Sequence, residues 1–292
     1  FASNTSTLPI SGLAEASSRP DNFIGLHFFS PVDRMPLVEI IRGRETSDET
    51  LAKAIDYVKA IRKTPIVVND SRGFYTSRVF ATYVREGLAM LAEGVTPALL
   101  ENAGKMAGMP VGPLALADEV SIELMYRIGR QTQEDLGDDY VASPADGLVQ
   151  HMVEDLGRLG KKAGKGFYDY PGDGPKRLWP GLAAEFPVVA EQPDVEEVKK
   201  RVMYIQSVET ARCMEEGVVT ENRDADVGSI MGWGFPPCRG GVISQIDMVG
   251  VEDFVTECDR LAQAHGARFS PPQMLRDMAA KGESFYGQRK AA

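Results

Sequence analysis

The sequence holds few cysteines and histidines and no long apolar run. Only three residues of each kind occur among the 292, and Cys213, Cys238 and Cys258 lie far apart without the spacing of metal ligands. We therefore predict reduced thiols, no disulfide framework and no metal site. No segment approaches the roughly twenty apolar residues that cross a bilayer, and the first residues do not form a signal peptide. These absences predict a cytoplasmic protein without a membrane span.

Positive charge is also scarce. The chain has 32 Lys and Arg against 42 Asp and Glu, which gives a net charge of −10. A nucleic acid or an anionic membrane requires a basic face, and short basic groups such as residues 199–201 are better explained as solvated helix surface. We expect neither partner. With 43% hydrophobic and 25% charged residues, the chain has the composition of two or three modest globular domains.

The sequence also lacks a phosphate-binding turn. No Gly-x-Gly-x-x-Gly joins a strand to a helix with an acidic residue about twenty positions further on. The nearest approach, Gly232-x-Gly234, continues as Phe-Pro-Pro, which predicts a loop that ends a helix. Because Phe1 is not a methionine and the chain enters on the end of a strand, we expect it to be a piece of a longer polypeptide.

The first seventy residues nevertheless alternate strands and helices. The pattern predicts a strand end, a short helix, two strands, a longer helix that Thr46 caps with Glu49 three residues later, and a last strand, over residues 1–4, 9–16, 25–29, 37–41, 46–61 and 64–69. This order is typical of the second half of a doubly wound sheet. Small polar residues follow the first strand, at the edge where such sheets bind ligands.

Two polar residues stand on otherwise apolar strand faces. Because strand side chains alternate, His27 shares a face with Gly25 and Phe29, and Glu39 lies between two aliphatic residues of the next strand. An ionised Glu in such surroundings costs several kcal/mol unless it is paired, so the imidazole is its expected partner. The alternative is that His27 satisfies a core hydrogen bond while Glu39 points to solvent. The pattern alone leaves both interpretations open.

From Gly73 onward the period is helical. We predict helices over about 80–91, from Thr96-Pro97, after Asp118 towards Gly137, and over 145–159. A group of positions then recurs 123 residues later: Arg78-Val79, Glu86 and Glu93-Gly94-Val95 reappear as Arg201-Val202, Glu209 and Glu216-Gly217-Val218. We infer a duplicated helical domain with its two copies packed face to face, rather than two unrelated bundles that share Glu-Gly-Val by accident.

The predicted domain boundaries follow from these patterns. Residues 1–70 form the C-terminal half of an α/β domain, and residues 71–170 form the first helical domain. A proline- and glycine-rich linker covers 171–195, and the second helical domain covers 196–292.

Several ordered motifs resemble the 3-hydroxyacyl-CoA dehydrogenases. They are Ser-Asn-Thr-Ser at 3–6, His-Phe-Phe-Ser-Pro-Val at 27–32, the twelve-residue step from His27 to Glu39, Gly73-Phe74, and residues 161–168. The chain looks most like the multifunctional members that carry an enoyl-CoA hydratase on the same polypeptide, and the resemblance covers nearly all of it. It implies an α+β, mainly α fold, in which the C-terminal part of a Rossmann-type NAD-binding α/β domain precedes two tandem all-helical dehydrogenase C-terminal domains.

The resemblance also implies a reaction, the NAD-dependent oxidation of (3S)-3-hydroxyacyl-CoA to 3-oxoacyl-CoA. Removing the hydroxyl proton requires a base that titrates near the working pH, and histidine meets that requirement. By resemblance His27 is this base, Glu39 orients its ring and stabilises the imidazolium, and Ser6 contacts both the substrate and the nicotinamide.

Four further positions match family sites. By resemblance Asn4, Ser30 and Lys162 contact the dinucleotide and Ser77 contacts the substrate, together with Ser6. At two of these the chain departs from simpler members, which have Asn where it has Ser30 and Ser77. A serine keeps a hydroxyl but loses the second hydrogen-bonding group of the amide, so these two contacts are less secure than the His–Glu pair.

Partners and alternatives follow from the same resemblance. We expect a hydratase domain upstream on the same polypeptide and a thiolase subunit as a further partner. One alternative is a non-catalytic helical assembly module of a β-oxidation complex, against which the joint presence of Ser6, His27 and Glu39 argues. Another is a related NAD-dependent β-hydroxyacid dehydrogenase, but such enzymes use a lysine base on a helix, and no lysine here occupies a comparable position.

Overall fold

The computed structural model describes residues 1–6 and 8–287. Thr7 and the last five residues of the predicted second helical domain, 288–292, lie outside this described part. Its three cysteines are free thiols, two of them buried. Within the same residues, no helix is long and apolar enough to cross a membrane.

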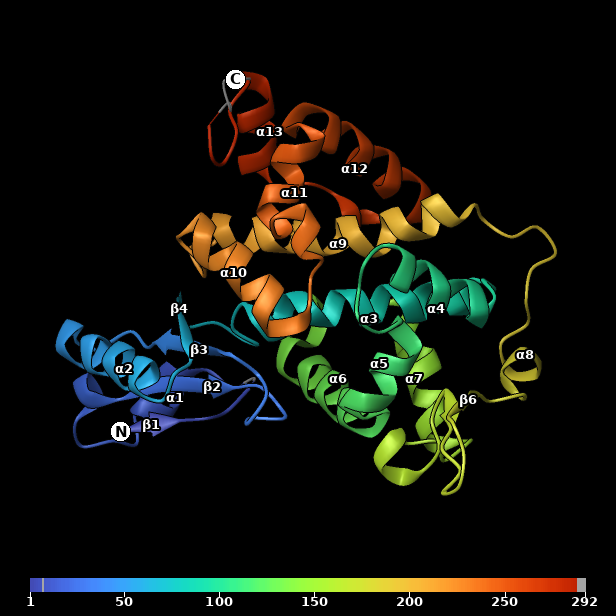
Figure 1. Cartoon of the computed structure of the whole chain (residues 1–292), viewed down its shortest axis with the longest axis horizontal. Coiled ribbons are helices and arrows are strands. Elements are labelled where there is room, and N and C mark those ends of the chain that lie inside the picture. The colour runs from blue at the N-terminus through green and yellow to red at the C-terminus, as the bar shows by residue number, and fades with distance from the viewer. Residues whose placement is uncertain (7, 288–292) are drawn as a thin grey trace. The chain divides into compact units, whose positions relative to one another are not determined.

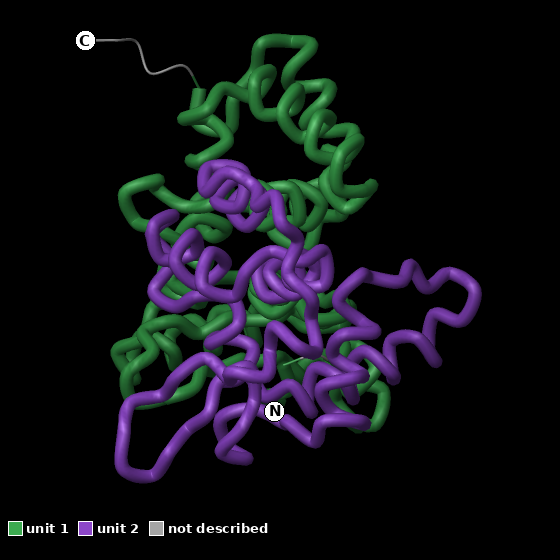
Figure 2. Tube along the Cα trace, turned by 90° about the vertical axis from the view of Figure 1, so that its right-hand side faces the viewer, with its two compact units in different colours: residues 1–81, 204–292 green, residues 82–203 purple. Residues whose placement is uncertain are grey.

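The chain divides into two compact units. One consists of residues 1–81 and 204–292, and the other of residues 82–203 (Figure 2). The helices α3 (Thr76–Ala92) and α9 (Val195–Glu215) each pass from one unit into the other, so both contribute side chains to both units.

A four-stranded sheet lies in the first unit. Its strands follow the order of the chain: β1 (Ala2–Ser3), β2 (Ile24–Phe28), β3 (Leu37–Arg42) and β4 (Thr64–Asn69) (Figure 1). β1 and β2 are parallel, β2 and β3 antiparallel, and β3 and β4 parallel. The last three strands confirm the predicted ranges to within one residue, because period-two alternation is a local signal that these apolar segments carry clearly.

One face of the sheet packs against α2 (Asp48–Ala60), which lies beside the strands in Figure 1. The buried cluster between them consists of Ile24, Leu26, Val38, Ile40, Ala54 and Val58. Residues of even number on β2 and β3 therefore face α2, and His27 and Glu39 point to the opposite side. The short helix α1 (Ile10–Ala14) lies within the range predicted for it.

The prediction that Thr46 caps α2 is wrong. Ser47 is the cap, and its Oγ accepts a hydrogen bond from the backbone N–H of Thr50 at 3.2 Å. The hydroxyl of Thr46 instead donates to the carbonyl of Phe23 at 2.7 Å and accepts from the N–H of Gly43 at 3.0 Å. Thr46 and Ser47 both have side chains that can cap a helix. Thr46 instead contacts Phe23, which is distant in the sequence, so Ser47 is the cap.

The second unit is mainly helical. After the C-terminal part of α3 come α4 (Pro97–Met106), α5 (Pro113–Val120), α6 (Ile122–Leu136), α7 (Pro144–Glu154), the strands β5 (Tyr168–Asp169) and β6 (Arg177–Leu178), and α8 (Leu182–Glu185). The helix start at Pro97 is confirmed, and the helix expected over 145–159 ends at Glu154. The prediction of a single helix that starts after Asp118 is wrong, because Asp118 lies inside α5. Ser121, with φ at 84°, separates α5 from α6.

The helices of the first unit continue from α9 as α10 (Asn222–Trp233), α11 (Val242–Val249), α12 (Val251–His265) and α13 (Gln273–Lys281). Two of these helices have the same lengths as helices of the other unit, since α5 and α11 each have eight residues and α6 and α12 each have fifteen. Gly250, with φ at 94°, separates α11 from α12 as Ser121 separates α5 from α6.

A buried acid of α5 holds an aromatic turn in the second unit. Asp118 accepts hydrogen bonds from the N–H groups of Phe167 and Tyr168 at 2.8 and 2.9 Å. The hydroxyl of Tyr168 donates to Glu101 of α4 at 2.7 Å, and Glu101 also accepts from the N–H of Leu114 at 2.7 Å. Burial raises the pKa of the Asp118 carboxyl above its usual value.

The first unit contains the same set of bonds. Asp247 of α11 accepts from the N–H groups of Phe285 and Tyr286, both at 2.9 Å. The hydroxyl of Tyr286 donates to Asp226 of α10 at 2.8 Å, and Asp226 accepts from the N–H of Ile243 at 2.8 Å. Corresponding helices thus use corresponding acids for the same bonds.

Candidate active site

His27 of β2 and Glu39 of β3 are direct neighbours across the antiparallel pair of strands. His27 Nδ1 lies 2.9 Å from Glu39 Oε2, and the two side chains are 9% and 0% exposed. The predicted contact between them is confirmed. The alternative in which Glu39 points to solvent is excluded by its burial.

The carboxylate of Glu39 has three hydrogen-bond donors besides His27. Its Oε1 accepts from the backbone N–H groups of Tyr75 and Thr76, both at 3.0 Å. Its Oε2, which faces His27, also accepts from the hydroxyl of Thr76 at 2.5 Å. Tyr75 directly precedes α3 and Thr76 is its first residue, at the helix end where unpaired N–H groups favour a negative charge.

The donors around Glu39 favour one distribution of hydrogen bonds in the pair. A backbone N–H can only donate, so Oε1 of Glu39 cannot carry a proton between two of them. An ionised carboxylate accepts all four bonds without conflict, and the proton shared with His27 then belongs on Nδ1. Within residues 1–6 and 8–287, no hydrogen bond engages Nε2 of His27. That nitrogen is therefore left as a proton acceptor.

Aromatic rings flank the imidazole. The ring centroid of Phe29 lies 4.6 Å from that of His27, and the centroid of Phe74 lies 6.0 Å away. Phe74 is completely buried and has a left-handed backbone, with φ at 50°. A bulky residue in this region costs about 1 to 3 kcal/mol. This turn leads directly into the N–H groups that bind Glu39.

Helix α10 packs against the other side of this turn. The hydroxyl of Tyr75 donates to the carbonyl of Ala225 at 2.8 Å. A Cβ atom at Gly228 would lie 2.8 Å from Ile66, and one at Gly232 would lie 3.1 Å from Leu37. Two glycines one turn apart thus let the helix backbone approach strands β3 and β4 closely.

Asn4, Ser6 and Ser30 follow the carboxyl ends of β1 and β2, as predicted for ligand contacts. Asn4 Oδ1 accepts a hydrogen bond from the N–H of Phe28 at 2.9 Å, which leaves its amide NH₂ as a donor. Ser6 and Ser30 are exposed, and among the described residues no hydrogen bond joins Ser6 to His27.

The remaining two predicted positions lie elsewhere. Ser77 is the second residue of α3, next to Thr76 in the first unit, and is partly buried. Lys162 is exposed in a short 3₁₀ turn of the second unit, over Lys161–Ala163. The structure of the first unit therefore brings together His27 and Glu39, and places Ser77 beside a donor to Glu39.

A shallow pocket at the edge of the sheet is not the site of this pair. Ala2, Asn4, Leu26, Phe28 and Tyr57 line it, with Ser3. Leu26 and Phe28 alternate with His27 along β2, so the pocket opens on the α2 face while the imidazole lies on the other.

Two family models match the chain. Residues 1–71 match the NAD-binding domain of 3-hydroxyacyl-CoA dehydrogenase, and residues 73–170 match the C-terminal domain of 3-hydroxyacyl-CoA dehydrogenase. The chain belongs to the 3-hydroxyacyl-CoA dehydrogenase family. The matches confirm the resemblance of the motifs and, with the observed elements, the predicted Rossmann-type part followed by helical dehydrogenase structure.

Curated relatives of this chain are longer proteins. The fatty acid oxidation complex subunit alpha of Shewanella frigidimarina is 41% identical over 292 residues, and that of Pseudomonas syringae pv. tomato is 42% identical over 295 residues. The matches take in 98% and 99% of this chain, which spans 40% of the length of each relative.

Solved dehydrogenases share the fold. The 3-hydroxybutyryl-CoA dehydrogenase of Escherichia coli matches 96% of this chain and 75% of its own, with a TM-score of 0.77 and 21% identity, which shows the fold alone. The (S)-3-hydroxybutyryl-CoA dehydrogenase of Ralstonia eutropha is 39% identical over 58% of this chain and 60% of its own, with a TM-score of 0.53.

The residues present fit one end of NAD. The amide donor of Asn4 and the exposed hydroxyls of Ser6 and Ser30 stand at the carboxyl ends of parallel strands, where a nicotinamide and its ribose need hydrogen bonds. The 292 residues contain no Gly-x-Gly-x-x-Gly turn for the pyrophosphate.

Sequence reasoning missed Tyr75 and Thr76, the donors to Glu39. The only signal was their place directly after the family motif Gly73-Phe74. A threonine at a helix start normally indicates a cap for its own helix, so its bond to a glutamate 37 residues earlier was not visible in the sequence.

Proposed function

We propose that this chain carries the dehydrogenase site of an enzyme of fatty-acid β-oxidation, which oxidises (3S)-3-hydroxyacyl-CoA to 3-oxoacyl-CoA with NAD. The observation that carries the proposal is the hydrogen-bonded pair of His27 and Glu39, in which Nε2 of the imidazole is left as an acceptor. Membership of the dehydrogenase family supports it. A purely structural helical module would not need a buried imidazole with one nitrogen bound to a carboxylate and the other left as an acceptor.

His27 is the general base in this proposal. Its Nε2 accepts the proton of the substrate hydroxyl, and Glu39 stabilises the imidazolium that forms through the bond to Nδ1. NAD, when bound, takes the hydride from the carbon that carries this hydroxyl. Phe29 and Phe74 keep water away from the ring, which strengthens the interaction with Glu39.

Substrate and cofactor contacts follow the family pattern. We assign Ser6 to the substrate oxygen and the nicotinamide, and Ser77 to the substrate. Asn4, Ser30 and Lys162 are assigned to NAD. The position of Asn4 and the two exposed serines at one sheet edge supports this assignment for the first unit.

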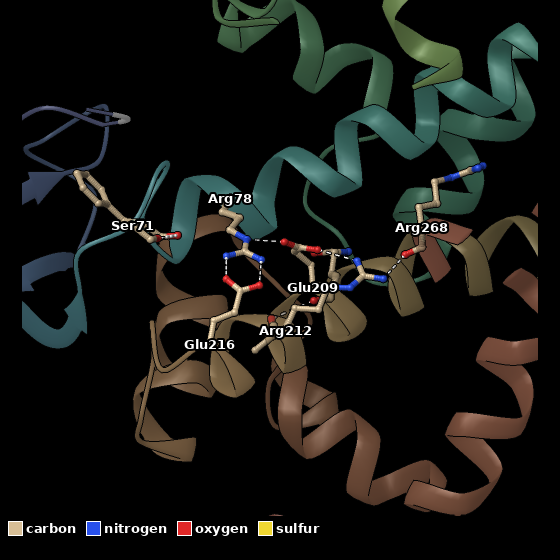
Figure 3. Close-up of polar contacts among 9 residues, drawn as sticks. Ser71, Arg78, Glu209, Arg212, Glu216 and Arg268 are labelled. Carbon is tan, nitrogen blue, oxygen red and sulfur yellow. Dashed lines mark hydrogen bonds and ion pairs between the residues drawn. The ribbon is translucent and has the colours of Figure 1, made fainter. Parts of the chain in front are cut away.

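The predicted domain organisation is part of the proposal: residues 1–70, 71–170 and 196–292 are domains, and the third duplicates the second. The matching helix lengths and the matching bonds of Asp118 and Asp247 support it. Two sets of ion pairs, related by the same 123-residue offset, also support it. In one set Arg78 pairs with Glu209 and Glu216 (Figure 3). In the other set Arg201 pairs with Glu86 and Glu93.

These pairs are exchanged between the copies. Each arginine pairs with glutamates of the other copy, which is the contact pattern of a two-fold interface. In Figure 3 Glu209 also accepts from Arg212, at 2.8 Å, and Arg212 donates to the carbonyl of Arg268 at 2.8 Å. We propose that the second copy takes the place that a partner subunit has in single-copy dehydrogenases.

The larger assembly is a further part of the proposal. The curated relatives are alpha subunits of a fatty acid oxidation complex and are longer than this chain. Their greater length supports further domains on the same polypeptide, and the name of an alpha subunit supports a partner subunit. By resemblance we assign these roles to an enoyl-CoA hydratase domain and a thiolase subunit, in a cytoplasmic enzyme.

The full-length protein, assayed for NADH formation, tests the activity. We expect NAD-dependent oxidation of (3S)-3-hydroxyacyl-CoA and little or none of the (3R) enantiomer. Absence of NADH formation with (3S) substrates of short, medium and long chain would contradict the proposal.

A further inference from the structure

Thr76 makes two of the four hydrogen bonds that reach the carboxylate of Glu39. Its backbone N–H donates to Oε1 at 3.0 Å, and its hydroxyl donates to Oε2 at 2.5 Å. The side chain is 1% exposed, so water does not replace it. Oε2 is also the oxygen that binds His27 Nδ1 at 2.9 Å. The hydroxyl therefore shares one oxygen with the imidazole.

The orientation of this carboxylate is not fixed by its own side chain. The last torsion of a glutamate joins a tetrahedral carbon to a planar one, and its energy profile is broad. Rotation about this torsion moves both oxygens together, so the hydrogen bonds to Oε1 and to Oε2 resist it jointly. Among the described residues, Thr76 supplies the only hydrogen bond besides that of His27 that holds Oε2.

The surroundings hold Thr76 itself in place. A Cβ atom at Gly232 of α10 would lie 3.7 Å from Cγ2 of Thr76, so this helix backbone passes close to the methyl group. The preceding residue, Tyr75, is bound to Ala225 of the same helix. The methyl group thus packs towards α10 while the hydroxyl points to Glu39. A threonine meets both requirements, because valine lacks the donor and serine lacks the methyl.

We infer that Thr76 is a positioning residue for the dehydrogenase reaction: its hydroxyl holds Oε2 of Glu39 against Nδ1 of His27 and so keeps Nε2 directed at the substrate hydroxyl. This inference rests on the proposed function. Thr76 acts through Glu39 and does not itself contact the reacting atoms.

The test is a set of variants of the full-length protein, assayed for NADH formation. Thr76→Val keeps the shape of the side chain and removes the hydroxyl, and we expect kcat to fall about ten-fold with KM for both substrates changed less than about two-fold, the size expected for one hydrogen bond to a charged group. Thr76→Ser restores the donor and should return kcat to within about three-fold of the wild type.

A double-variant experiment separates positioning from a general structural effect. In a Glu39→Gln background the hydroxyl has no carboxylate to hold, so Thr76→Val should lower kcat by less than about two-fold further. Thr46→Val is the matched control, because Thr46 is also buried and also donates to a buried acceptor, the carbonyl of Phe23. It should leave kcat unchanged. If Thr76→Val does not fold, Thr76→Ala replaces it and must show the same loss.

Three outcomes overturn the inference: normal turnover of the valine or alanine variant, an equal loss in the serine variant, or a full ten-fold loss on top of Glu39→Gln. A wild type without dehydrogenase activity would instead overturn the proposed function, so the two failures are distinguishable.

Discussion

Arg201 and Glu86 form an ion pair that is almost completely buried, with side chains 3% and 1% exposed. Arg201 Nε lies 2.7 Å from Glu86 Oε1. Arg78 and Glu209 repeat this contact from positions 123 residues away, with Nε 2.5 Å from Oε1, but their side chains are 21% and 13% exposed. The same bond therefore occurs twice in the chain at two degrees of burial.

This difference predicts unequal effects of removing the two arginines. Arg201→Met removes a cation from the buried carboxylate of Glu86, and we expect it to lower the free energy of unfolding by about 3 to 5 kcal/mol. Arg78→Met, where water reaches the partner, should cost about 1 to 2 kcal/mol. Urea unfolding of the two variants measures this. Equal losses would show that burial does not control the strength of these pairs.

A second prediction concerns the turn that Asp118 holds. A Cβ atom at Gly166 would lie 1.9 Å from Oδ1 of Asp118, so Gly166→Ala must displace the carboxylate from the N–H groups of Phe167 and Tyr168. We expect a loss of about 3 kcal/mol or more, because a buried carboxylate loses its donors. Gly147→Ala is the matched control.

Gly147 is exposed inside α7 and has no atom within 4 Å of the added methyl group. Replacing it should stabilise the protein by about 0.5 to 1 kcal/mol, since alanine favours the helix. Thermal unfolding of both variants decides the question. A Gly166→Ala protein as stable as the wild type would mean that the turn can move away from Asp118.

The strands were predictable because they depend on local alternation. For His27 and Glu39 the alternation left two interpretations open, and the resemblance of the motifs to the dehydrogenase family favoured the contact. Nothing local distinguished Thr46 from Ser47 as the cap of α2, since both side chains accept hydrogen bonds from helix N–H groups. Asp118 was placed before a helix instead of inside one, because the sequence around Ser121 lacks a glycine or proline to mark the break.

The surroundings of Glu39 could not be predicted for a different reason. Tyr75 and Thr76 meet Glu39 only after β3 and the start of α3 have packed together, and Gly232 approaches them from a helix more than 150 residues later. Contacts of this kind depend on tertiary packing, which neither periodicity nor composition reports. The 123-residue offset was visible because charged residues recur at matched positions along the sequence.

A third prediction concerns pH. His151 of α7 contacts Asp155 through Nδ1 at 2.7 Å and Glu185 of α8 through Nε2 at 2.9 Å. The hydrogen bond to Asp155, then that to Glu185, raises the pKa of the imidazole above its usual value. A histidine whose pKa is higher in the folded protein stabilises it fully below its ordinary pKa of about 6.5, and this contribution is lost as the pH rises through the raised value.

The difference in unfolding free energy between the wild type and His151→Gln measures this contribution. It should be largest at mildly acidic pH and should shrink towards zero at alkaline pH, where the neutral ring no longer attracts both carboxylates. A difference that stays constant from acidic to alkaline pH would show that the contact does not depend on the charge of His151.

The last prediction concerns catalysis at the pair itself. His27→Gln removes the nitrogen that accepts the substrate proton, and we expect kcat to fall by about two to four orders of magnitude, with NAD affinity nearly unchanged. Glu39→Gln keeps the shape of the acid but removes its charge, and an amide cannot accept from all the donors that surround it. The ring then loses its countercharge, so kcat should fall by about one to two orders of magnitude.

His265→Gln, in α12 of the same unit, is the matched control and should leave kcat unchanged. The assay is steady-state NADH formation by the full-length protein, with NAD binding measured by calorimetry. A His27→Gln enzyme with near-normal kcat would remove the assignment of His27 as the base, and a loss confined to KM would indicate a role in binding instead.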